Sequence, residues 1–118
     1  MIAKYLPLAV KGLLTLAFVA AGAAKLIGAE MMVATFDAIG WGQWFRYVTG
    51  GIEIGAALLL WVPGKQIIGA FLLTATMICA VLFHLLVLGP SALPAAVLGL
   101  LSAYILYVHR GQLNGQAT

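Results

Sequence analysis

Residues 66–88, QIIGAFLLTATMICAVLFHLLVL, decide the fold class of this chain. The segment contains no Asp, Glu, Lys or Arg, and its apolar residues form one continuous run. A helix needs about 20 mostly apolar residues to cross a bilayer, whereas the strands of a membrane barrel alternate apolar and polar positions. The segment therefore predicts a membrane-spanning α-helix.

The composition of the whole chain favours an integral membrane protein. Of its 118 residues, 64% are hydrophobic and only 8% are charged, against about 25% charged residues in a soluble domain. So few charges exclude a soluble globular enzyme, a disordered chain and a nucleic-acid-binding protein, because six basic residues are too few for a phosphate-binding face. We expect residues 1–118 to form a single integral membrane domain.

Three further apolar stretches have the character of spanning helices. The four predicted spans cover residues 5–28, 47–62, 66–88 and 91–109. The second span is short, so it either begins a turn earlier, near Trp44, or lies in a locally thinned bilayer. Tight turns at Pro63-Gly64 and Gly89-Pro90 end the second and third spans. The prediction is an all-α membrane protein, a bundle of four transmembrane helices.

The one long connection, residues 29–46, holds a predicted interfacial helix between the first and second spans. We expect residues 31–39 to form a short amphipathic helix on the membrane surface. Its apolar residues Val33, Phe36 and Ile39 would face lipid, and Glu30 and Asp37 would face water. The alternative is an irregular loop.

The basic residues predict the orientation of the chain. With four spans, both termini lie on one side of the membrane, and this side holds Lys4, Lys11, Lys65 and Arg110. The other side holds Lys25 and Arg46. Because cytoplasmic loops carry an excess of Lys and Arg, we expect both termini in the cytoplasm. The alternative for the first segment is a secretory signal peptide, whose removal would leave three spans.

Three ionisable residues are predicted to lie at one depth. Lys25 is about 4.5 Å from the outer end of its span, Glu53 about 9 Å and His84 about 6 Å, at a rise of about 1.5 Å per residue. A charge near the bilayer centre costs at least about 2.5–3.5 kcal/mol, so such groups need partners or a function. We therefore predict a Lys/Glu/His polar cluster in the outer half of the bundle.

Helical spacing places each member of this cluster on a face with small residues. The three faces are Lys11, Thr15, Phe18, Gly22 and Lys25; Thr49, Glu53, Ala56 and Leu60; and Gly69, Leu73, Thr76, Ala80 and His84. Small residues let helix backbones approach closely. We expect the GxxxG motif of Gly51 and Gly55 to act in this way, and the seam of Ala95, Gly99 and Ala103 on the fourth span.

Individual polar residues have more than one interpretation. Glu53 either pairs with Lys25 and fixes the register of two helices, or it is a proton- or ligand-binding carboxylate. His84 either packs through a hydrogen bond or joins the cluster, where it could transfer protons near neutral pH. Cys79 is interpreted as an inert buried thiol. The side chains of Lys11 and His109 are expected to snorkel to the inner surface.

Several metal and redox sites are excluded by residue content. The single cysteine allows no internal disulfide, no CxxC pair and no thiolate zinc cage. The two histidines, His84 and His109, lie near opposite membrane surfaces and cannot share a haem iron. Metal-ligand spacing such as HExxH does not occur. We expect no metal site and no covalently bound cofactor.

Three short motifs carry a family resemblance: AGAAKL at residues 21–26, GGIEIG at 50–55 and AVLFHL at 80–85. With them the sequence resembles the DoxX and DoxX-like family of small bacterial membrane proteins. The resemblance implies a four-helix bundle in the bacterial cytoplasmic membrane, with Lys25, Glu53 and His84 as signature polar positions. It also implies a link to redox chemistry, since the family takes its name from a quinone-linked sulfur oxidation system.

Four functions agree with these features. The first is a quinone- or lipid-contacting accessory component of a membrane redox system, in which Lys25, Glu53 and His84 contact the ligand and a redox partner protein supplies the electrons. The second is a small proton-coupled transporter that uses Glu53 and acts as a homo-oligomer. The third is a cofactor-free membrane enzyme with Glu53 and His84 as acid and base. The fourth is a structural subunit in which the polar cluster only fixes packing.

Overall fold

The computed structural model describes residues 2–88 and 91–114. Within these residues every secondary-structure element is a helix, and there is no strand. The elements are α1 (Ile2–Ile27), α2 (Glu30–Ile39), α3 (Trp44–Leu59), α4 (Gln66–Phe83), the π-turn η1 (His84–Leu88), α5 (Leu93–Val108) and the 3-10 helix η2 (Arg110–Asn114). The predicted all-α class is confirmed.

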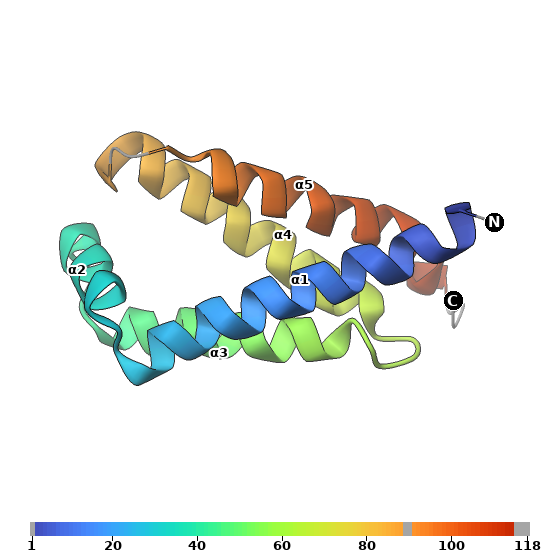
Figure 1. Ribbon diagram of the computed structural model, residues 1–118, viewed down its shortest axis with the longest axis horizontal. Helices are drawn as coiled ribbons and strands as arrows, with labels where there is room; N and C mark the ends of the chain where they lie inside the picture. The colour runs from blue at the N-terminus through green and yellow to red at the C-terminus, as the bar shows by residue number, and fades with distance from the viewer. Residues whose placement is uncertain (1, 89–90, 115–118) are drawn as a thin grey trace.

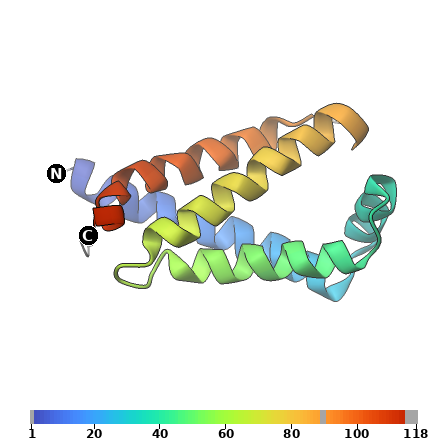
Figure 2. The same ribbon diagram turned by 180° about the vertical axis from the view of Figure 1, so that it is seen from behind.

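The long helices form two pairs that meet at one end of the molecule and separate at the other. In Figure 1, α1 packs along α3 and α4 packs along α5, and the two chain termini lie together at the end where the pairs meet. Figure 2 shows the same divergence from behind, with α2 standing at the open end. The molecule measures 43 × 23 × 23 Å. The divergence leaves room between the two pairs beside α2.

Large apolar side chains fill the closed part of the bundle. Leu14 and Phe18 of α1, Leu60 directly after α3, Leu73 of α4 and Ile105 of α5 are completely buried. They are joined by the small residues Ala56, Ala57 and Ala70 in one cluster. The predicted helix faces that contain Phe18, Leu60 and Leu73 therefore do point into the bundle.

Glycines set the closest helix crossings, but they are not the predicted GxxxG pair. A Cβ atom at Gly22 would lie 2.7 Å from the carbonyl oxygen of Gly50, and one at Gly69 would clash with the carbonyl oxygen of Ala56. Gly51 and Gly55 have nothing within 4 Å of a Cβ position. The assignment of the close approach to Gly51 and Gly55 was wrong, because a one-residue step along a helix turns the next glycine about 100° away from the partner.

Two helices are long and apolar enough to cross a membrane. They are Lys4–Ile27 and Gln66–Leu88, and Leu93–Val108 is a shorter apolar helix. The second predicted span lies three residues earlier than expected, since α3 covers Trp44–Leu59. The turn predicted at Gly89-Pro90 lies outside the described residues. A bundle with four membrane crossings stays a prediction.

The connection between α1 and α3 folds as the predicted short helix. Gly28 ends α1 with a left-handed backbone (φ +75°), and Gly40 ends α2 in the same way (φ +84°), a conformation that glycine adopts without strain. The prediction that Phe36 faces lipid was wrong. Phe36 is buried and meets the ring of Phe45 edge-on at 5.7 Å. Helical periodicity identifies an apolar face, but it does not show whether that face contacts protein or lipid, because both are apolar.

Candidate functional site

A cleft of about 500 Å³ lies between the two helix pairs at the end of the molecule that holds α2. Its walls come from the last turn of α1, from α2, from the first half of α3, and from α4 with η1. The lining is largely apolar and includes Met31, Ile39, Val48, Leu72 and Leu88. Lys25, Glu53 and His84 all line this cleft. The sequence predicted these three residues in one polar cluster at a shared depth, and the cluster and its role stay a prediction.

An ion pair joins α1 to α3 at the wall of the cleft. The Nζ atom of Lys25 lies 2.7 Å from Oε1 of Glu53. Their side chains are 13% and 2% exposed, respectively, so the lysine side chain is the more accessible of the two. The Gly22–Gly50 contact lies one turn from both residues and brings the two backbones close enough for the pair to form.

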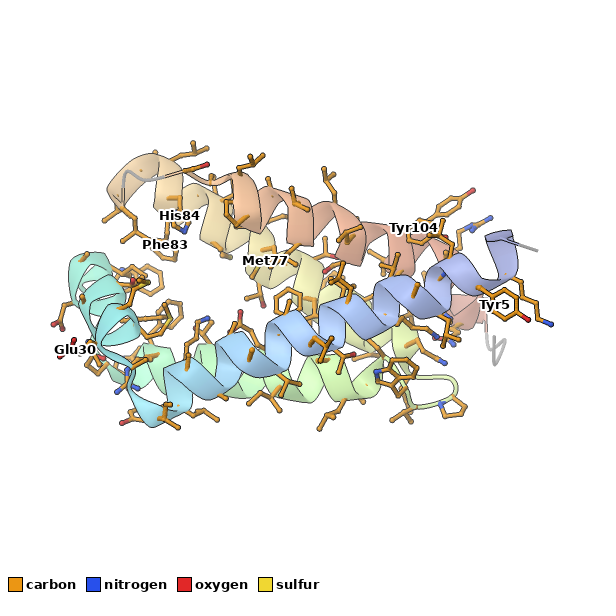
Figure 3. The ribbon with its side chains drawn as sticks, viewed as in Figure 1. Tyr5, Glu30, Met77, Phe83, His84 and Tyr104 are labelled. Atoms are coloured by element: carbon orange, nitrogen blue, oxygen red, sulfur yellow. The ribbon has the colours of Figure 1, made fainter. Side chains whose placement is uncertain are left out.

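His84 approaches the same cleft from the opposite helix pair. It begins the π-turn η1 at the end of α4, and such turns occur often at functional sites. Figure 3 shows His84 and Phe83 on the side of α4 that faces α2, with Met77 farther along the same helix. The cleft therefore has an ion pair on one wall and an imidazole on another.

Three threonines on three helices add hydrogen-bond acceptors to the lining. Thr35 of α2, Thr49 of α3 and Thr76 of α4 all border the cleft. Each hydroxyl donates its proton to the backbone carbonyl four residues earlier, at 2.8, 2.8 and 2.7 Å, respectively. A hydroxyl has one proton and two lone pairs, so each oxygen has only acceptor capacity left.

Phenylalanines form an aromatic corner of the cleft. Phe36, Phe45 and Phe83 line it from α2, α3 and α4. The ring of Phe45 lies 5.7 Å from that of Phe36 and 6.3 Å from that of Phe83, centre to centre, in edge-on arrangements. Trp41 covers Phe45 and Phe83 from outside, at 5.1 and 5.5 Å. Edge-on aromatic contacts of this kind hold rigid, apolar surfaces in place.

A buried arginine ties the three helices around the cleft together. Arg46 is only 5% exposed. Its Nε donates to Oε1 of Gln43 at 2.7 Å, and its Nη1 donates to the carbonyl oxygen of Lys25. Gln43 in turn donates from Nε2 to Asp37 of α2 at 2.7 Å. Arg46 thus fixes the backbone of Lys25 at the end of α1, and it holds α2 beside the cleft through Gln43.

Sequence reasoning treated Arg46 only as an outer-side basic residue and missed this role. The available signal was an arginine in the first turn of an apolar helix, which needs several acceptors wherever it is buried. Two other interpretations were wrong. Cys79 is exposed on α4 and lines the cleft, and His109 is buried beside Gln112 with Nδ1 3.5 Å from Nε2. Periodicity does not fix which face of a uniformly apolar helix is covered.

Lys11 lies against the indole ring of Trp61, with Nζ 5.5 Å from the ring centre. Trp61 also donates from Nε1 to the hydroxyl of Thr15 at 2.7 Å. These contacts fasten the turn after α3 to α1, far from the cleft along α1.

In the described part of the chain, no group of three or more His, Cys, Asp or Glu residues is placed to hold a metal ion.

Comparison with known families gives the cleft a context. A model of the DoxX-like family matches residues 9–106, which include Lys25, Glu53 and His84. The chain belongs to the DoxX-like family. Membership and the two long apolar helices indicate a membrane protein. Searches of curated proteins and of solved structures found no match to this DoxX-like chain.

Proposed function

We propose that this DoxX-like protein binds a quinone or a similar lipophilic small molecule in the cleft, as an accessory component of a membrane redox system. The observation that carries the proposal is an apolar cleft of about 500 Å³ bordered by the Lys25–Glu53 ion pair and by His84. Ligand pockets are typically about 300–1,000 Å³, largely apolar, with a few polar groups that orient the ligand. The cleft has this character throughout.

The ion pair supports recognition of a polar head on an apolar ligand. An ammonium group has three N–H donors, and one of those on Lys25 is directed to Glu53. Because the Lys25 side chain is partly exposed and lines the cleft, the remaining donors can reach a ligand oxygen. His84 lies across the cleft as a second hydrogen-bonding group and a candidate for proton relay.

The outer surface supports a position within the lipid bilayer. Leu16 of α1, Leu86 of η1 and Leu100 of α5 are all more than 70% exposed, and exposed apolar side chains on every helix pair suit a lipid surround. We propose four crossings by α1, α3, α4 and α5 in the bacterial cytoplasmic membrane. The basic residues near the shared terminal end favour cytoplasmic termini.

The residue content supports an accessory role. The chain has a single cysteine and so no dithiol pair for electron transfer. Electrons for a bound quinone would then pass to or from a redox partner protein that meets the same ligand. The contribution of this chain would be to bind the lipophilic molecule, to orient its polar head and to exchange protons with it.

Binding in lipid nanodiscs tests the proposal. We expect a short-chain quinone analogue to bind saturably to the protein. The Lys25→Met/Glu53→Met double variant, which removes both charges together, should bind it about tenfold more weakly or worse, because a hydrogen bond to a charged group contributes about 1.5–3 kcal/mol. The control is Glu30→Gln, since Glu30 lies on the outer side of α2 (Figure 3). Non-saturable uptake that is equal in the wild type and the double variant would contradict the proposal.

A further inference from the structure

The three threonines that line the cleft can only accept hydrogen bonds from a ligand. The hydroxyl protons of Thr35, Thr49 and Thr76 are all committed to backbone carbonyls within their own helices. Their oxygens therefore accept from a ligand but do not donate to it. The groups of the cleft that can donate are the ammonium of Lys25, which is a pure donor, and the imidazole of His84, whose ring nitrogens donate or accept according to the tautomer.

A ligand that only accepts hydrogen bonds fits one part of this lining. A quinone carbonyl can accept a hydrogen bond from Lys25. Beside a threonine oxygen, however, the same carbonyl would place two acceptors against each other. An unpaired polar group in an apolar site costs about 1–3 kcal/mol. A ligand hydroxyl satisfies both sides, because its oxygen accepts from Lys25 and its proton is donated to a threonine.

The aromatic corner selects for the body of the ligand. Phe36, Phe45 and Phe83 come from three different helices, and the ring of Phe45 meets each of the other two edge-on. They line the same cleft as the three threonines. Rigid aromatic walls favour a flat ring over a flexible chain, since ring–ring contacts have preferred geometries and little rotamer entropy is lost.

We infer that the cleft selects lipophilic molecules with an aromatic hydroxyl, such as an alkylphenol or a hydroquinone, over molecules that only accept hydrogen bonds, such as the corresponding quinone. This inference rests on the proposed function, because it names the ligand class of the same cleft. It predicts that the protein holds the reduced member of a quinone–hydroquinone couple more tightly than the oxidised one.

Four probes separate the two features of the ligand. A para-alkylphenol has both a flat ring and a hydrogen-bond donor, whereas its methyl ether has the ring without the donor. A straight-chain alcohol of equal carbon number has the donor without the ring, and an alkyl quinone has a flat ring that carries only acceptors. Dissociation constants would be measured with the protein in nanodiscs and expressed as mole fractions in lipid, which removes differences in partitioning. We expect the phenol to bind about tenfold more tightly than the ether and the quinone, and more tightly than the alcohol.

Threonine-to-valine variants test the acceptors directly. Because a phenol has one hydroxyl proton to donate, at least one of Thr49→Val and Thr76→Val should weaken phenol binding about 2- to 10-fold, as expected for one hydrogen bond, and both should leave binding of the methyl ether unchanged. The matched control is Thr74→Val. Thr74 lies on α4 and also donates to the carbonyl four residues earlier, at 2.7 Å, but it does not border the cleft.

The outcomes separate this inference from the proposed function. Equal affinity for phenol, ether and quinone would overturn the selectivity for donors while leaving the binding function intact. Loss of phenol and ether affinity to the same extent in Thr76→Val would also overturn it, because the threonine would then act through packing alone. Saturable binding of none of the four probes would overturn both proposals.

Discussion

Replacement of Lys25 by methionine should destabilise the protein strongly, because it would leave Glu53 buried without its counter-charge. Oε1 of Glu53 lies 2.7 Å from Nζ of Lys25, and the glutamate side chain is only 2% exposed. Loss of one member of a buried ion pair costs about 3–5 kcal/mol. We expect Lys25→Met to lower the free energy of unfolding by this amount.

The double variant Lys25→Met/Glu53→Met should recover most of that loss. An apolar pair of similar volume is often as stable as the buried ion pair that it replaces, so we expect a stability within about 1 kcal/mol of the wild type. Ligand binding should remain impaired, since the polar contacts are gone. Recovery of stability without recovery of binding would show that the ion pair is kept for its chemistry rather than for stability.

Reversible unfolding in mixed micelles, followed by the helical circular dichroism signal, measures both variants. Lys65→Met is the control, because Lys65 is exposed in the turn before α4, and it should change the unfolding free energy by less than about 0.5 kcal/mol. If Lys25→Met is as stable as this control, Lys25 does not compensate a buried charge on Glu53. The same conclusion follows if the double variant is no more stable than Lys25→Met alone.

Gly50→Ala should lower the free energy of unfolding by about 1–3 kcal/mol, because a Cβ there would lie 2.9 Å from a carbonyl oxygen of α1. Gly51→Ala should raise it by about 0.5–1 kcal/mol in the same unfolding assay. Equal effects of the two substitutions would contradict the helix crossing at Gly50. Arg46→Met should lower the thermal midpoint and weaken ligand binding, and the exposed Arg110→Met should change neither, so an unaffected Arg46 variant would exclude its positioning role. Cys79, the single cysteine, should react with a small maleimide and be protected by bound alkylphenol, as followed by mass spectrometry; an unreactive thiol would contradict its exposure in the cleft.

The sequence predicted the helices and the Lys25–Glu53 pair because both leave periodic or compositional signals. Runs of apolar residues defined the helices to within a few residues. Spacing of three and four placed Glu53 on the same face as Ala56 and Leu60, which are buried with it. Unpaired charges are costly in lipid, and so the convergence of Lys25 and Glu53 was predictable.

The wrong predictions all required a choice between surroundings that are equally apolar. Phe36 and Cys79 were assigned the wrong environments, since neither residue reveals whether lipid, protein or a cleft lies beside it. The close crossing was assigned to Gly51 rather than Gly50 because adjacent glycines differ only in direction. The role of Arg46 depends on contacts between α1, α2 and α3, and no local pattern in the sequence specifies how those three helices meet.

Photolabelling would show directly whether a lipophilic molecule binds in the cleft between the two helix pairs. A photoactivatable alkylphenol would be bound to the wild-type protein in nanodiscs, irradiated, and its attachment sites mapped by peptide mass spectrometry. We expect labels concentrated on cleft residues such as Met32, Met77 and Leu88, and we expect these labels to disappear when excess unlabelled phenol is added. Labels spread evenly over lipid-facing residues such as Leu16 and Leu100, unaffected by the competitor, would contradict binding in the cleft.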